Sequence, residues 1–288
     1  AYLFQFDGSN WMQLAKVGPS GPATSARFGL SVGVSGSEVV VGSPEDDTDP
    51  SGVGTLEDSG AAYVFGDSGN GWIQKAKLKA ADAGFDDHLG GSVDIDGDTI
   101  VLGSRRDDAT LDGNQGSAYV YQRDVQSGVW QHVQTLQALD GEIGDQFGAG
   151  VAVSGSVIIS GADLGDGLAS DCGAAYIFRR SGEVWIQEGK LTASDGALSD
   201  AFGNFVAVDG KTAVVGSIGD DIGVTDGGSA YVYHWTGQGW IEARKLVASD
   251  ITGHLGCAVA ISGTTVVVGA YLDDSVAVDS GSAYVFSP

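Results

Sequence analysis

A short aromatic motif recurs along the 288-residue chain and constrains its fold more than any other feature. It reads Gly-Ala-Ala-Tyr-Val-Phe at residues 60–65 and returns in closely related form at 116–121, 173–178, 228–233 and 281–286. Residues 1–4 match the tail of the same motif. The motif tyrosines are spaced 53 to 61 residues apart: Tyr2, Tyr63, Tyr119, Tyr176, Tyr231 and Tyr284. A period of this size indicates a repeat architecture such as a propeller or a solenoid.

Each repeat contains the patterns of four strands, as residues 201–246 illustrate. Apolar residues alternate over 202–208, and Asp209-Gly210 then supplies a tight hairpin turn. Residues 212–216 form a nearly continuous apolar run, which is typical of a strand buried on both faces. The aromatic motif is the third strand. The fourth, at 240–246, alternates charged with apolar residues, as expected for an outer strand with one face in water.

Four-stranded antiparallel units repeated radially form a β-propeller, and no segment has the period of a helix. The sequence therefore predicts an all-β propeller, with a parallel β-helix as the alternative. We expect one domain over residues 1–288, with repeat units at about 1–59, 60–115, 116–172, 173–227 and 228–288. Five blades are preferred, or six or seven if the chain is a fragment. The third strand occurs six times and the others five, so a closed five-bladed ring has one strand too many.

A second recurring pattern identifies the family that the chain resembles. Phe-Gly or Leu-Gly opens the first strand of each repeat, at residues 28–29, 89–90, 147–148, 202–203 and 255–256. A Gly-Ser or Gly-Ala pair follows about fourteen residues later, as in Gly42-Ser43-Pro44 and Gly161-Ala162-Asp163. The chain thus resembles, over its whole length, the FG-GAP repeat of integrin α-subunit N-terminal propellers and their bacterial and algal relatives. The resemblance implies recognition or adhesion outside the cell or at its surface, without catalysis.

Charge restricts the partners of such a propeller. The chain has 38 acidic and 14 basic residues, a net charge of −24 and a pI near 4.1. Nucleic acids and anionic membranes require clustered basic residues, so we expect neither as a partner. No apolar run is long enough to cross a membrane. Cations, or a basic protein, are the natural counterparts. The two cysteines, Cys172 and Cys257, occupy non-equivalent positions and do not suggest a disulfide.

Calcium sites of the integrin kind are not expected. Family members that bind calcium in that manner carry an Asp-x-Asp-x-Asp-Gly-x-x-Asp loop between the first and second strands. In this chain that connection is a two-residue turn in every repeat, such as Ser35-Gly36 or Asp209-Gly210. The nearest imitation, residues 94–98, lacks the length to surround an ion.

The acidic residues collect instead in two other connections, which an antiparallel blade places on the same face. Within the repeats, the loops between the second and third strands carry the candidate ligands Asp46, Asp47, Asp58, Asp107, Asp108, Asp163, Asp220, Asp221, Asp273 and Asp274. The connections from one blade to the next carry the candidates Asp82, Asp87, Asp140, Asp145, Asp195 and Asp200, and their acidic residues also include Asp86 and Asp250. One face of the propeller should therefore display a ring of carboxylates.

Three interpretations of this ring remain open. Aspartate favours tight turns because its side chain bonds nearby backbone amides, so the pattern can reflect turn chemistry alone. Carboxylates from adjacent loops can instead hold Ca²⁺ or Mg²⁺. The ring can also dock a basic protein or a glycan, with help from exposed aromatic residues such as Trp235 and Tyr271.

Enzymatic interpretations have less support. The repeated acids do not form one differentiated acid and base pair, and no nucleophile or phosphate-binding motif is present. The histidines form no local metal motif, although His88 and His254 share a position just before the first strand and each is a candidate solitary ligand. A structural alternative is a surface filament or matrix, in which a spare terminal strand pairs with the sheet edge of a neighbouring copy.

Overall fold

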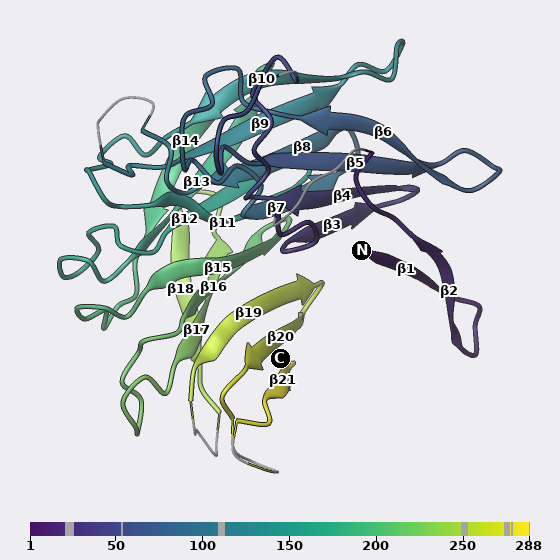
Figure 1. Ribbon diagram of the computed structural model, residues 1–288. Helices are drawn as coiled ribbons and strands as arrows, with labels where there is room; N and C mark the ends of the chain where they lie inside the picture. Colours follow the sequence, from purple (N-terminus) through teal and green to yellow (C-terminus); the bar gives the residue numbers. More distant parts are fainter. Residues whose placement is uncertain are drawn as a thin grey trace.

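The computed structural model describes residues 1–20, 26–52, 54–108, 113–248, 253–273, 277 and 279–287. These residues form strands β1 to β21 and no helix, and hence no helix that could cross a membrane. Consecutive strands pair as antiparallel sheets, and the sheets follow one another as the blades of a propeller (Figure 1). The predicted all-β propeller with four-stranded antiparallel blades is confirmed.

Four repeats form complete blades. The first two contain β3 (Val32–Ser35), β4 (Glu38–Ser43), β5 (Ala61–Asp67) and β6 (Trp72–Leu78), then β7 (Ser92–Asp96), β8 (Thr99–Ser104), β9 (Ser117–Arg123) and β10 (Trp130–Leu136). The next two contain β11 (Phe147–Ser154), β12 (Val157–Ala162), β13 (Ala174–Ser181) and β14 (Val184–Leu191), then β15 (Phe202–Asp209), β16 (Thr212–Ser217), β17 (Ser229–Trp235) and β18 (Trp240–Leu246). Each blade runs in chain order from its inner to its outer strand.

The remaining strands make two smaller sheets. The last repeat contributes β19 (Leu255–Ser262), β20 (Thr265–Ala270) and β21 (Ser282–Phe286), while β1 (Tyr2–Phe6) and β2 (Trp11–Lys16) pair with each other. The hairpin β1–β2 corresponds to the third and fourth strands of a blade that would precede the first blade. Ala1 and Leu3 pack against the first blade's apolar cluster, which includes Val41 and Tyr63. Among the described residues, β21 forms no ladder with β1 or β2, and Figure 1 shows the hairpin apart from the last blade.

Neighbouring blades are joined at their inner strands. β7 lies beside β11, and the side chains of β7 accept hydrogen bonds from the backbone of β11. Val153 N donates to Asp94 Oδ2 at 2.8 Å, and Gly155 N donates to Asp96 Oδ2 at 2.7 Å. The inner edge of one blade thus satisfies amides that a sheet edge would otherwise leave unpaired.

The two glycines of the repeated pattern explain how closely the blades approach. A Cβ atom added to Gly161 would lie 1.7 Å from the carbonyl oxygen of Gly203 in the following blade, and one added to Gly103 would lie 2.0 Å from that of Gly148. Gly148 and Gly203 themselves have φ angles of 92° and 102°, which L-residues with side chains rarely adopt. The repeated glycines therefore allow the backbones of neighbouring blades to pack in direct contact.

The core lies between the blades rather than within one of them. Val40 and Val64 of the first blade pack against Val93 and Ile95 of the second. At the next interface, the second and third blades share a cluster in the same way, as Val120 and Val153 illustrate. Each blade therefore buries its apolar surface only when a neighbour stands on either side.

The two ends of the row of blades show this dependence. Val32 and Val34 of β3 are 59% and 70% exposed, whereas Val93 and Ile95, their equivalents in β7, are 6% and 3% exposed. At the other end, Val267 and Val285 of the last repeat are also exposed, although Val214 and Val232 are buried at the same positions of the preceding blade. An apolar face is therefore left in solvent at each end.

Candidate functional site

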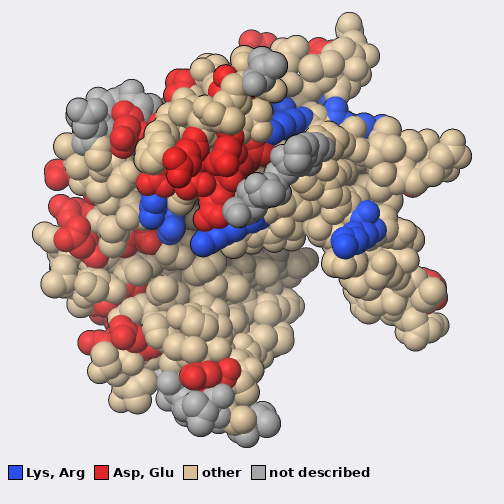
Figure 2. All heavy atoms as spheres, in the orientation of Figure 1, with Lys and Arg blue, Asp and Glu red and all other residues tan. Residues whose placement is uncertain are grey.

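Two kinds of connection, from the second to the third strand and from one blade to the next, meet on one surface, which we name the loop face. Tyr119 Oη donates to Asp82 Oδ1 at 3.1 Å and to Asp107 Oδ2 at 2.9 Å, so carboxylates from both kinds of connection converge on one hydroxyl. Tyr231 joins Asp195 and Asp220 in the same way, at 2.7 and 3.0 Å. Acidic side chains also form conspicuous clusters on the surface seen in Figure 2.

The first aspartate of the loop is buried and holds the motif tyrosine. Asp46 accepts hydrogen bonds from Tyr63 Oη at 2.5 Å and from Lys77 Nζ at 2.9 Å. Burial alone would raise the pKa of Asp46, but the hydrogen bonds from Tyr63, Lys77 and Thr48 outweigh it and hold the pKa well below its usual range. Asp107, Asp220 and Asp273 are buried and accept from their own tyrosines in the same manner.

The third blade departs from this arrangement, and Asp163 is not the equivalent of Asp46. Gly165 stands there instead: its carbonyl accepts from Gly173 N at 2.8 Å, as Asp46 O accepts from Gly60 N at 3.1 Å. The buried hydroxyl of Tyr176 consequently has no loop aspartate to bond among the described residues, and Asp140, in the connection between β10 and β11, is the carboxylate that interacts with it. Asp163 lies elsewhere and accepts from Asn204, and its buried Oδ1 has no hydrogen-bond partner in the described part of the chain.

The second aspartate of each loop closes the loop on itself. Asp47 Oδ1 accepts from Asp58 N at 3.0 Å, and Asp221 Oδ1 accepts from Asp226 N at 3.0 Å. Asp108 bonds the amides of Gly113 and Asn114 likewise. Asp274, the fifth of the set, lies outside the described residues. These carboxylates serve the turn chemistry that the sequence suggested.

The connections between blades use their aspartates in two ways. Asp87, Asp145 and Asp200 are buried and accept from the amide three residues earlier. Burial, together with the nearby charges of Asp107 and Asp108, raises the pKa of Asp87 to about 6. The more exposed Asp140 and Asp195 form ion pairs with Lys190 and Lys245, each at 2.7 Å.

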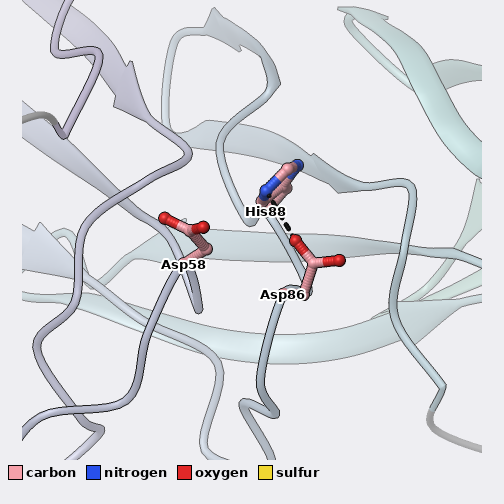
Figure 3. Close-up of side chains that lie close together, drawn as sticks. All are labelled: Asp58, Asp86 and His88. Atoms are coloured by element: carbon pink, nitrogen blue, oxygen red, sulfur yellow. Dashed lines mark ion pairs between the residues drawn. The ribbon is translucent and has the colours of Figure 1, made fainter.

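The structure does assemble one group of three metal-ligating side chains among the described residues: Asp58, Asp86 and His88 (Figure 3). Their ligand atoms all lie within 4.8 Å of one another, and His88 Nε2 is 3.0 Å from Asp86 Oδ1. Arg106 Nη1 donates to both oxygens of Asp86, at 2.9 and 2.8 Å. Burial, and then the charge of Arg106, lowers the pKa of His88, which favours a neutral imidazole.

Sequence reasoning found only part of this group. Asp58 was among the candidate ligands and His88 was noted as a solitary candidate, whereas Asp86 was counted in the carboxylate ring but not among the candidate ligands. The available signal was the run Asp86-Asp87-His88 just before Leu89-Gly90. Asp58 joins this group because the loop between β4 and β5 contacts the connection between β6 and β7.

A central pocket of about 930 Å³ adjoins this group. Inner-strand residues of all five repeats line it, and so do Asp58, Asp86, His88 and the arginines Arg27, Arg105 and Arg106. Arg27 pairs with Glu45 at 2.9 Å, so the lining carries both signs of charge. The arrangement suits polar ligands or metal ions better than apolar ones.

Exposed apolar side chains stand among the carboxylates of the loop face. Phe85, Ile143 and Leu198 occupy equivalent positions in three successive connections between blades, each two residues before the buried aspartate. They are 62 to 66% exposed. Apolar residues repeated at an exposed position next to charged ones are typical of a protein-binding surface.

Comparison with known families agrees with this architecture. The FG-GAP repeat matches residues 11–65, 72–121, 130–178, 185–233 and 240–286, five segments that together cover most of the chain. A comparison with curated proteins finds no match. The five matched segments, the interlocking glycines and the four-stranded blades agree, and the chain therefore belongs to the FG-GAP repeat family of β-propellers.

Proposed function

We propose that this chain is a non-enzymatic recognition module, acting outside the cell or at its surface, that binds a protein or glycan through its loop face. The observation that carries the proposal is the repeated exposure of Phe85, Ile143 and Leu198 within an acidic surface. The FG-GAP propeller fold is typically non-catalytic and supports the same conclusion. A net charge of −24 favours a basic partner, whose approach it would accelerate at low salt.

Binding to immobilised cationic peptides and to an array of glycans tests this proposal. A triple variant, Phe85→Ser with Ile143→Ser and Leu198→Ser, should lose the partner that the unmodified chain retains. Val125→Ser is the matched control, because Val125 is also exposed but lies in a turn between the third and fourth strands, away from the loop face. Equal binding by the triple variant and the unmodified chain would rule out the loop face.

The same assay, run with Ca²⁺ and with chelator, addresses the predicted calcium role of the face. The carboxylates of the loop face are engaged by tyrosines, lysines and backbone amides, which weighs against a bare cation site. If partner binding requires calcium and the requirement is lost in Asp47→Asn or Asp108→Asn, the result would favour calcium binding by the loop face. These two aspartates are more exposed than the loop aspartates that bond the motif tyrosines.

A structural role is the second candidate, and the exposed end faces favour it. Val32 and Val34 at one end, and Val267 and Val285 at the other, belong to surfaces that pack against each other wherever two blades meet inside the chain. The last blade of one copy can therefore pack against the first blade of another, which would build a filament. Sedimentation at increasing concentration should then show assembly that Val285→Asp abolishes and Val125→Asp does not. A chain that stays monomeric at all concentrations contradicts this role.

A further inference from the structure

The group formed by Asp58, Asp86 and His88 lies where two connections are fixed side by side. Asp58 belongs to the loop between β4 and β5, whereas Asp86 and His88 belong to the connection between β6 and β7. His88 N donates to Asp58 O at 3.0 Å, and Asp86 N donates to Glu57 O at 3.1 Å. These backbone bonds fix the two connections to each other, and Figure 3 shows the three side chains lying close together there.

We propose that Asp58, Asp86 and His88 bind a divalent transition-metal ion of the Zn²⁺ class. One imidazole nitrogen and two carboxylates within 4.8 Å of one another match the ligands of such ions, whereas Ca²⁺ and Mg²⁺ take oxygen ligands alone. Water from the adjoining pocket completes the coordination. This site is independent of the proposed recognition function.

The arginines beside the site have opposing effects on metal binding. Arg106 donates to both oxygens of Asp86, and hydrogen bonds of this kind orient a carboxylate ligand. The positive charges of Arg105 and Arg106, which line the same pocket, weaken cation binding, and the strongly acidic chain offsets them. The incoming ion replaces the contact between His88 Nε2 and Asp86 Oδ1, so imidazole and carboxylate turn toward the metal instead of toward each other.

The next interface between blades shows the same backbone without the ligands. Gln146 N donates to Asn114 O at 3.3 Å, as His88 N does to Asp58 O. The φ angles of Asn114 and Gln146 are 62° and 59°, close to the 51° and 58° of Asp58 and His88. Asn and Gln therefore fit this backbone conformation, and Asp58→Asn and His88→Gln should remove the ligands without disturbing the fold.

Calorimetric titration of the chelator-treated full chain with ZnCl₂ tests the site. We expect one Zn²⁺ per chain and a raised melting temperature. Asp58→Asn and His88→Gln should each weaken zinc binding by about tenfold or more, and CaCl₂ should not compete. His254→Gln is the control, because His254 has the equivalent position at a later interface. Visible absorption of the Co²⁺-loaded chain should change in His88→Gln and not in His254→Gln.

Three results would overturn the proposal: no zinc binding by the unmodified chain, unchanged affinity in His88→Gln, or an equal loss in His254→Gln. The melting temperature of each variant without metal shows whether it folds. Loss of partner binding in the loop-face triple variant, with zinc binding intact, would separate the two functions.

Discussion

At the scale of single residues, the repeats act as controls for one another. The same tyrosine, in the same strand, bonds a loop aspartate in Tyr231 but not in Tyr176, because Gly165 stands at the position of Asp220. Lys190 keeps its place beside Tyr176, with its Nζ 5.3 Å from the ring centroid, as Lys245 does beside Tyr231 at 5.0 Å. Differences between repeats therefore isolate what each contact contributes.

The two tyrosines should respond differently to loss of the hydroxyl. Tyr231→Phe removes one hydrogen bond from each of Asp220 and Asp195, whose other donors are Ser229 and Lys245, and should cost about 1–3 kcal/mol of unfolding free energy. Tyr176→Phe removes a hydroxyl that bonds no loop aspartate and interacts only with the more exposed Asp140, so its cost should be smaller. Urea denaturation of both variants measures the difference, and an equal cost for the two would contradict this account.

Restoring the missing aspartate should stabilise the third blade. Gly165→Asp places a carboxylate within reach of Tyr176 and Lys190, the arrangement seen for Asp220, and should raise the unfolding free energy by about 1 kcal/mol. Gly165→Ala measures the backbone effect separately. In a Tyr176→Phe background the gain should shrink, as a double-mutant cycle would show.

At the scale of strands and loops, sequence patterns predicted the elements and missed some of the contacts between them. Strand four of the fourth blade was predicted at 240–246 and is β18, because alternation of charged and apolar residues marks a strand with one wet face. Asp163 lies in the predicted loop, between β12 and β13, but membership of the loop did not show which residue takes the position of Asp46. Counting from Gly161, as Asp46 is counted from Gly42, points to Gly165.

Contacts between connections and between blades were harder to anticipate. The group around His88 depends on two loops meeting, and the role of the paired glycines depends on backbone atoms of different blades, which no local pattern encodes. Turn chemistry for Asp47 and Asp221, by contrast, was foreseeable because their hydrogen bonds are local.

The glycine interlock makes a direct prediction about blade packing. Gly161→Ala brings a methyl group into the Gly203 carbonyl and should destabilise the chain by about 3 kcal/mol or more, since backbone on both sides prevents an easy adjustment. Gly189→Ala in β14 is the control, because a Cβ there meets no atom within 4 Å. Thermal unfolding compares them, and similar melting temperatures would show that the blades are not so tightly joined.

At the scale of the whole molecule, buried carboxyls set the response to pH. Burial raises the pKa of Asp87 and of Asp94 to about 6, and it raises the pKa of other buried aspartates as well: Asp145, Asp163 and Asp200. A raised carboxyl pKa means that the folded state binds the proton more tightly than the unfolded chain does. These groups therefore destabilise the fold at neutral pH, and protonation relieves the penalty.

The melting temperature should consequently rise as the pH falls from 7 to about 5. One effect opposes the rise, and a second lowers stability only at more acidic pH. His88, with a lowered pKa, costs stability below its unfolded pKa of about 6.5, and Asp46, with a depressed pKa, loses its contribution only below about 4. Five carboxyls outweigh one imidazole, so a maximum near pH 5 is expected. Asp87→Asn should flatten the rise in a calorimetric pH series, whereas a steady fall below pH 7 would show that the imidazole dominates.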